Sequence, residues 1–262
     1  MRRCWDGIPL PRELAPIIDD ARTIALLAAI EQRAAWAEGP DACGRHLRIR
    51  SLLPIEEAMA AADAGVIVAT PAFGAWLHIP PALARRGYRV GLLDLRPAAR
   101  RPARYPAPGP GLDLRVFPST GYARPLVRFV TEERGLLVVL TDEASGPRTA
   151  GGALLGRAVT IGSTPFELAR RADVKIVPVF AVRALKGHDL HVEGTLKVFS
   201  TGRGDADLDA TASRWLRLLD RHVRRRPEHY LATLLVRHAS RYDDPVPLFA
   251  DSVTAGEQRR AR

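Results

Sequence analysis

The sequence predicts an α/β fold with a mixed, mostly parallel central sheet flanked by helices. Three observations predict it. Short apolar runs typical of buried strands alternate with stretches of helical apolar spacing. The first two runs, residues 66–70 and 88–95, enclose a turn and a helix, which is the unit from which parallel sheets are built. The chain of 262 residues is 47% hydrophobic, which is enough for one sizeable core.

We expect an N-terminal helical segment over residues 1–50, because apolar residues recur at helical spacing over 11–37. This helix would either pack on the core or lie in a membrane interface. The α/β domain then covers residues 51–250. Its first expected elements are a helix at 52–62, the strand 66–70, a turn at 71–74, a helix at 75–86 and the strand 88–95.

Proline, arginine and glycine dominate residues 97–111, which predicts an exposed loop that is either a lid or a variable insertion. Pro178 lacks an amide donor, so the strand around it is expected to be bulged or to lie at a sheet edge. Residues 251–262 are expected to form a disordered basic tail. The other expected elements are strands at 112–118, 135–141 and 174–182, a polar loop at 143–152, an irregular or hairpin segment at 154–161, an antiparallel partner strand at 188–199, and helices at 123–134, 163–172 (capped by Ser163, with Glu167 in its first turn) and 208–226.

The formal net charge of +10 is concentrated in two segments. Residues 85–104 hold seven arginines against one aspartate, and residues 213–262 hold eleven arginines against six acidic residues. Within the second segment, the run 221–226 is either a solvated helix end or a patch for an anionic surface. Such patches predict an anionic partner such as a lipid head group, an acidic carrier protein or a phosphorylated cofactor. Nucleic acid is disfavoured, because aromatic residues do not interleave with the charges.

Two cysteines, Cys4 and Cys43, cannot build a disulfide framework, and no apolar signal peptide is visible. No window reaches the roughly 18 apolar residues that a membrane-spanning helix needs. We therefore expect a cytoplasmic protein, with peripheral attachment to the inner face of the cell membrane left open.

Candidate catalytic side chains lie after two of the predicted strands. Asp142 and Glu143 follow the buried strand 135–141, where an open α/β sheet binds its ligands, although an aspartate there also starts turns. His78 lies past the turn at 71–74 and is either a proton-handling group or a structural helix histidine.

A metal site is disfavoured. His188 and His191 are three residues apart on a predicted strand, so their side chains point to opposite faces.

An ordered set of motifs runs through about residues 50–240. They are residues 65–70, 73–76, 135–142, 155–160, 165–172 and 177–180, then Arg183, Trp215 with Leu218 and Leu219, and residues 226–230. Taken in this order, they resemble the late acyltransferases of lipid A biosynthesis, which belong to the wider group of bacterial lysophospholipid acyltransferases. The resemblance implies an acyltransferase-like fold.

Members of that family join an acyl chain from a thioester to a hydroxyl group. Their signature, His-x-x-x-x-Asp/Glu just after the first strand, supplies a general base and the carboxylate that orients it. In this sequence the two positions hold Ala72 and Leu77, so both catalytic groups are replaced. The resemblance implies no resident cofactor, with acyl-coenzyme A or an acyl carrier protein thioester as donor and partner. The binding residues that it implies are Phe73, Gly74, Trp76, Arg157 and Arg183.

Three hypotheses follow. The first is an acyltransferase-like enzyme with altered chemistry, such as transfer to an amine, in which His78, Asp142 or Glu143 assists. The second is a non-catalytic relative that keeps the acyl-chain groove and binds a lipid, an acyl carrier protein or a partner enzyme. The third is an unrelated basic α/β binding protein. Replacement of both dyad residues favours the second over retained transfer to a hydroxyl.

Overall fold

The computed structural model describes residues 14–38, 45–93, 111–117, 123–142 and 148–231. The predicted loop up to residue 110, Glu143 and the predicted tail at 251–262 lie outside these residues. The helices are α1 (Leu14–Glu38), α3 (Leu53–Ala62), η2 (Trp76–His78), α4 (Ile79–Ala84), α5 (Ala123–Thr131), α6 (Thr164–Ala172), α7 (Asp205–Arg225) and η4 (Pro227–His229). The strands are β1 (Leu47–Ile49), β2 (Val66–Thr70), β3 (Val90–Leu93), β4 (Leu114–Phe117), β5 (Leu136–Leu140), β6 (Thr149–Leu154), β7 (Arg157–Gly162), β8 (Ile176–Arg183) and β9 (His188–Val192).

Seven strands form one mixed sheet in the order β1-β9-β8-β2-β5-β3-β4. Strands β8, β2, β5, β3 and β4 run parallel to one another, β9 runs antiparallel to β8, and β1 is parallel to β9. The predicted α/β class with a mixed, mostly parallel sheet is therefore confirmed. Among the described residues, β6 and β7 form a separate two-stranded antiparallel hairpin.

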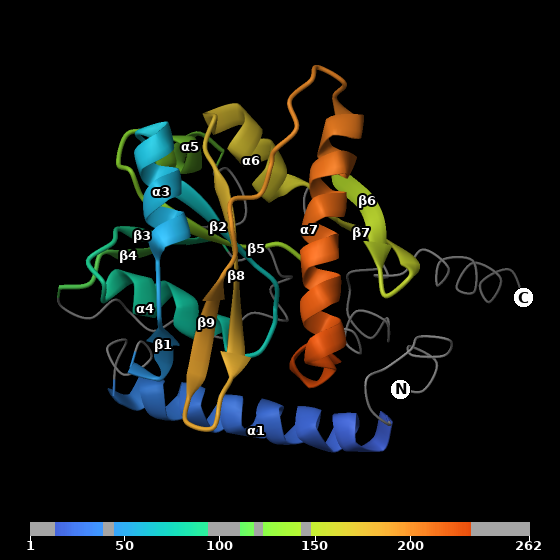
Figure 1. Cartoon of the computed structure of the whole chain (residues 1–262). Helices are drawn as coiled ribbons and strands as arrows, with labels where there is room; N and C mark the ends of the chain where they lie inside the picture. Colours follow the sequence, from blue (N-terminus) through green and yellow to red (C-terminus); the bar gives the residue numbers. More distant parts are fainter. Residues whose placement is uncertain (1–13, 39–44, 94–110, 118–122, 143–147, 232–262) are drawn as a thin grey trace, which may run out of the picture.

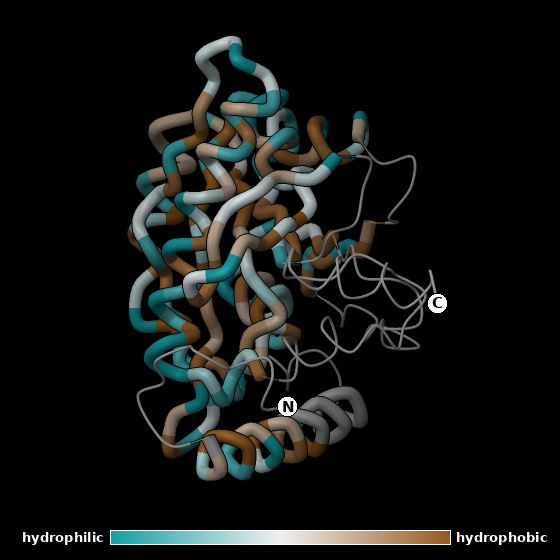
Figure 2. Tube along the Cα trace, turned by 90° about the vertical axis from the view of Figure 1, so that its right-hand side faces the viewer, coloured by the Kyte–Doolittle hydropathy of each residue, from teal (hydrophilic) through white to brown (hydrophobic). Residues whose placement is uncertain are grey.

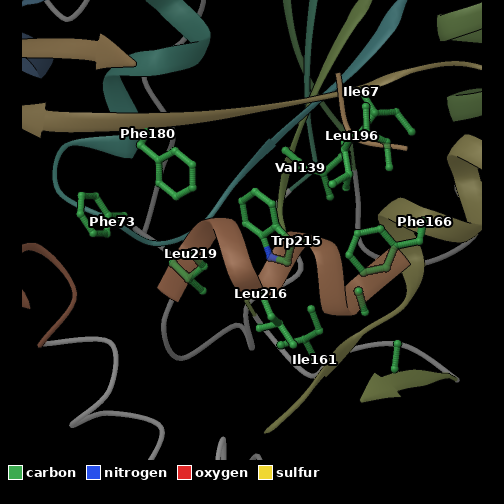
Figure 3. Packing of buried hydrophobic residues seen from close by; sticks show 14 of the residues in the cluster. Ile67, Phe73, Val139, Ile161, Phe166, Phe180, Leu196, Trp215, Leu216 and Leu219 are labelled. Carbon is green, nitrogen blue, oxygen red and sulfur yellow. The ribbon is translucent and has the colours of Figure 1, made fainter. Parts of the chain in front are cut away.

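Helices cover both faces of the sheet, so alternate residues of its inner strands enter two separate cores. On one side, Ile67 and Val139 pack with α5, α6, α7 and the β6–β7 hairpin around Trp215 (Figure 3). On the other side, Val68 and Val138 pack with α3 and α4. Because neither face meets water, β2, β5 and β3 are apolar along their whole length, as parallel strands usually are.

Helix α1 crosses one end of the molecule, below β8 and β9 (Figures 1 and 2). Ile17 on its first half is fully buried in the core, and α1 also packs against η4. The expectation of a helix over 11–37 is confirmed for the described residues, and this helix packs on the core. Among the described helices, none is long and apolar enough to cross a membrane.

Pro178 lies in a central strand, so the predicted edge or bulged position is wrong. Strand β8 stands between β9 and β2. It pairs with β2 up to Pro178 and with β9 from Val179 onward. The proline thus stands where the ladder with β9 ends, and its carbonyl still accepts the amide of Glu193 at 2.9 Å. The amide donor that Pro178 lacks would lie at the end of the ladder with β9, which is why this central strand tolerates a proline.

Other expectations are corrected in detail. Strand β6 begins within the predicted polar loop. The turn at Leu155 and Gly156 has positive φ at both positions, which lets the residues before it pair with β7 as a hairpin. The short strand β1 was not predicted. The expected helix 75–86 is divided into η2 and α4, since Pro80 and Pro81 supply no amides to continue the first turn. Ser163 precedes α6 as expected, but its hydroxyl bonds Glu167 and the Arg148 carbonyl and does not cap an amide.

Candidate functional site

The turn that follows β2 is held by three other parts of the chain. The Ala72 amide donates to Asp142 Oδ2 at 3.0 Å, and the Gly74 amide donates to the His229 carbonyl at 3.0 Å. Gly74 also forms a parallel bridge with Ala181 of β8 and has a φ of 55°. The end of β5, strand β8 and η4 therefore fix this turn, at the edge of the sheet where the parallel strands end.

Asp142 is fully buried directly after β5, at the position where the sequence predicts a ligand-binding or turn-forming carboxyl. Its Oδ2 accepts both the Ala72 amide and the Tyr230 hydroxyl, the latter at 2.9 Å. The residues that it joins are 70 and 88 positions away in the sequence. Asp142 therefore ties the turn after β2 to the segment that follows α7.

Aromatic rings fill the space on the α7 side of this turn. Phe73 is fully buried and stacks on His229, with ring centroids 5.2 Å apart and an angle of 17°. The Phe73 and Phe180 rings form a T-shaped pair (Figure 3), and Phe180 stacks in turn on His222 at 3.8 Å between centroids. The His229 ring is also fixed, because its Nε2 accepts the Arg183 amide at 2.7 Å. The Phe73 ring is thus a fully buried core side chain.

A second cluster lies on the opposite face of the sheet, where α1 meets β8 and β9. His188 Nε2 lies 2.7 Å from Glu31 Oε2, and Arg183 Nη1 donates to Glu31 Oε1. The His188 ring stacks on His78, with centroids 5.7 Å apart. His78 is only 3% exposed, and its ring also meets that of His46 at 6.3 Å between centroids.

The charges of this cluster follow from its burial. Burial lowers the pKa of His188, and the hydrogen bond to Glu31 offsets only part of that effect. Burial raises the pKa of Glu31, but the hydrogen bonds from His188 and Arg183 outweigh it and hold that pKa below its usual value. At neutral pH the group is therefore a carboxylate, a guanidinium and a neutral imidazole whose Nε2 donates to Glu31. This arrangement fastens α1 to the sheet.

Another imidazole–carboxylate contact connects α7 to the residue after β9. His222 Nε2 lies 2.7 Å from Glu193 Oε1, and Arg221 donates to Glu193 Oε2 at 2.9 Å. Burial lowers the pKa of His222, and Glu193 offsets part of the shift. The neutral His222 ring then packs flat on Phe180, within the ring cluster around Phe73.

The other predicted site residues do not gather at this turn. Trp76 is 5% exposed and belongs to the core on the α4 side. Arg157 begins β7 in the hairpin that packs on α7, whereas Arg183 ends β8. Ala72 and Leu77, at the positions of the family dyad, are both half-buried.

Sequence reasoning did not assign a role to Glu31, Glu193 or His222, or to His229 and Tyr230. Each acts through a contact between segments far apart in the chain, and no local pattern marks such a contact. The one usable signal was the 226–230 motif, which the family resemblance includes.

No protein-family model matches this chain, and no curated protein is significantly similar to it in sequence.

The buried histidines predict a loss of stability in mild acid. Imidazoles in the unfolded chain titrate near 6.5, whereas His188 and His222 have lower pKa values when folded. Below pH 6.5 the unfolded state therefore binds more protons, and the free energy of unfolding falls by up to about 1.4 kcal/mol per pH unit for each histidine. Urea unfolding at pH 7.5, 6.0 and 5.0 measures the slope. Each of the variants His188→Gln and His222→Gln should flatten it, and an unchanged slope in both would contradict this assignment.

Proposed function

We propose that this chain is an acyltransferase-like protein that binds an acyl chain or an acyl thioester and has lost the family's usual transfer to a hydroxyl group. The observation that carries the proposal is the pair of residues at the turn after β2. Ala72 and Leu77 stand where the resemblance requires a base and its orienting acid. Neither side chain can accept a proton, and loss of a general base typically lowers a rate by about two to four orders of magnitude.

The contacts of Asp142 support this proposal. A buried carboxyl at the carboxyl end of a central strand is well placed to orient a base. Here its Oδ2 is occupied by the Ala72 amide and the Tyr230 hydroxyl. Asp142 thus acts as a positioning residue that holds the turn in shape, which suits a protein that keeps a binding surface without the chemistry.

The proposed partners are acyl-coenzyme A or an acyl carrier protein, and the proposed location is the cytoplasm or the inner face of the cell membrane. The charge distribution supports an anionic partner. Helix α7 has Arg224 and Arg225 in its last turn, and the Arg226 that follows is exposed. Anionic carriers and head groups are attracted to such a surface.

A second candidate is an enzyme with altered chemistry that acylates an amine. Two buried imidazole–carboxylate contacts, His188 with Glu31 and His222 with Glu193, favour it. A neutral amine is already nucleophilic and needs less help from a base than a hydroxyl. Both imidazoles are, however, buried and bound through Nε2 to their carboxylates, so the binding function remains the first proposal.

The acyl-binding proposal predicts that affinity rises with chain length. Isothermal titration should give tighter binding along the series butyryl-, hexanoyl- and octanoyl-coenzyme A, all used below their micelle concentrations. Each methylene that becomes buried contributes about 0.8 kcal/mol, which is about a fourfold gain in affinity. Free coenzyme A is the control, because it carries the phosphates without the chain. Equal affinity for all four ligands would overturn acyl binding.

Release of coenzyme A from an acyl thioester tests separately whether the protein has lost transfer to a hydroxyl group. With octanoyl-coenzyme A and lysophosphatidic acid, the protein should release thiol no faster than the buffer does. Release with an amine acceptor that disappears in His188→Gln or His222→Gln would instead support the second candidate. Hydroxyl-dependent release by the unaltered protein would overturn the proposed loss of transfer.

A further inference from the structure

A basic groove lies outside the turn and the ring cluster. The segment that leaves β9 runs back along α7 before it enters that helix (Figure 1). Between the two is a groove of about 420 Å³. Its walls carry Lys197 from the segment and Arg214, Arg217 and Arg221 from α7, with Glu193 at one end. The volume lies within the usual range for small-molecule sites, about 300–1,000 Å³.

The three arginines share one face of α7 because of their spacing. Residues three, four and seven positions apart lie above one another on a helix. Arg214, Arg217 and Arg221 follow this spacing and are exposed. The opposite face, which includes Trp215 and Leu219, is fully buried in the core. The packing of α7 therefore holds the basic face toward the groove.

The groove carries an excess of positive charge. Arg221 is paired with Glu193, whose other oxygen contacts His222. Within the part of the chain that the structure describes, no carboxylate lies within ion-pair distance of Lys197, Arg214 or Arg217. Lys197 and Arg214 each lie over the Phe199 ring, at 5.1 Å from its centroid. Cations that no carboxylate neutralises attract an anion into the groove.

We propose that this groove binds a phosphate group, with Arg214, Arg217 and Lys197 as its cationic contacts. Guanidinium groups donate paired hydrogen bonds to phosphate oxygens, and an ammonium group adds a point charge. The contact between Arg221 and Glu193 fixes the end of the groove and leaves the three other cations available. This site does not depend on the acyl-binding proposal, because phosphate binding here requires no acyl chain.

Titration with inorganic pyrophosphate at low and physiological salt tests the site. The double variant Arg214→Glu/Arg217→Glu should bind pyrophosphate at least about tenfold more weakly than the unaltered protein. The matched control is Arg171→Glu/Arg203→Glu, which changes the net charge equally at exposed arginines outside the groove. The control should keep its affinity. Equal affinity in all three proteins, or an equal loss in the control, would overturn the site.

A milder variant tests the same site with less risk of a folding defect. Arg217→Gln removes one exposed charge and should weaken pyrophosphate binding several-fold, with unchanged circular dichroism. If Arg217→Gln binds as tightly as the unaltered protein, Arg217 is not a contact and the proposal fails.

Two further ligands identify the source of the phosphate. Coenzyme A represents a soluble phosphate ester, and phosphatidylcholine vesicles with added phosphatidic acid represent a lipid head group. If either ligand competes with pyrophosphate and no longer binds to Arg214→Glu/Arg217→Glu, the site is supported and that ligand identifies the source of the phosphate. If both ligands bind the double variant as tightly as they bind the unaltered protein, their phosphates bind elsewhere and the proposal is overturned.

Discussion

Replacement of Gly74 by alanine is expected to destabilise the protein by about 3 kcal/mol or more. Gly74 has a φ of 55°, in the left-handed region that costs other residues about 1–2 kcal/mol. A Cβ atom at this position would also lie 2.1 Å from the Ala181 carbonyl oxygen. That oxygen belongs to β8, where Ala181 pairs with Leu190 of β9, so it cannot move away without disturbing the sheet. Urea unfolding at neutral pH measures the loss.

Gly87 provides the matched control. It has a φ of 85°, but a Cβ atom there would meet nothing within 4 Å. Gly87→Ala should therefore cost only the backbone strain, about 1–2 kcal/mol. A loss of the same size in both variants would contradict the argument, because it would mean that the contact with Ala181 adds nothing.

Asp142→Ala is expected to cost about 3–5 kcal/mol of the free energy of unfolding. The variant removes the acceptor of two hydrogen bonds in a fully buried position. The Ala72 amide and the Tyr230 hydroxyl would then lose this partner while remaining in place, and each such loss costs about 1–3 kcal/mol. A small cavity adds to the effect. The turn after β2 should also loosen, which hydrogen exchange at the Ala72 amide would detect.

Tyr230→Phe is the matched variant, because it removes the hydroxyl and keeps the buried ring. It should cost about 1–2 kcal/mol. The double variant Asp142→Ala/Tyr230→Phe should cost less than the two single losses added together, since both remove the same hydrogen bond. Strict additivity would show that the bond between these residues does not stabilise the fold.

Local sequence patterns located most of the helices and strands. The predicted strand at 66–70 has the bounds of β2, and the apolar run at 135–141 contains the whole of β5. Both strands are buried on two faces, so each is an uninterrupted apolar run that ends at polar or turn residues. The three-residue β1 was missed because alternation over so few positions has no recognisable period.

The strand containing Pro178 shows where local reasoning fails. A proline within a strand indicates an edge because its amide is missing. Whether the amide is needed depends on where the neighbouring ladders begin and end, and here the ladder with β9 ends at this residue. That end point is set by pairing with residues that come later in the chain.

The candidate site was predictable in part. The sequence placed Asp142 at the carboxyl end of a buried strand, and the structure finds it there. It could not supply the partners of Asp142, nor the contact between Glu31 and Arg183, which are 152 positions apart. The roles of Phe73 and Trp76 in binding a ligand stay predictions, and their side chains are 0% and 5% exposed.

The sequence by itself determined the α/β class and the position of the inner strands. These depend on residue identity and on apolar periodicity, which are local properties of the chain. Only the tertiary structure decided the order of the strands, the hydrogen bonds that Asp142 accepts from the Ala72 amide and the Tyr230 hydroxyl, and the pairing of Glu31 and Glu193 with buried imidazoles. Those features arise from packing between distant segments, and the free energy of such contacts exists only once the sheet and its helices have come together.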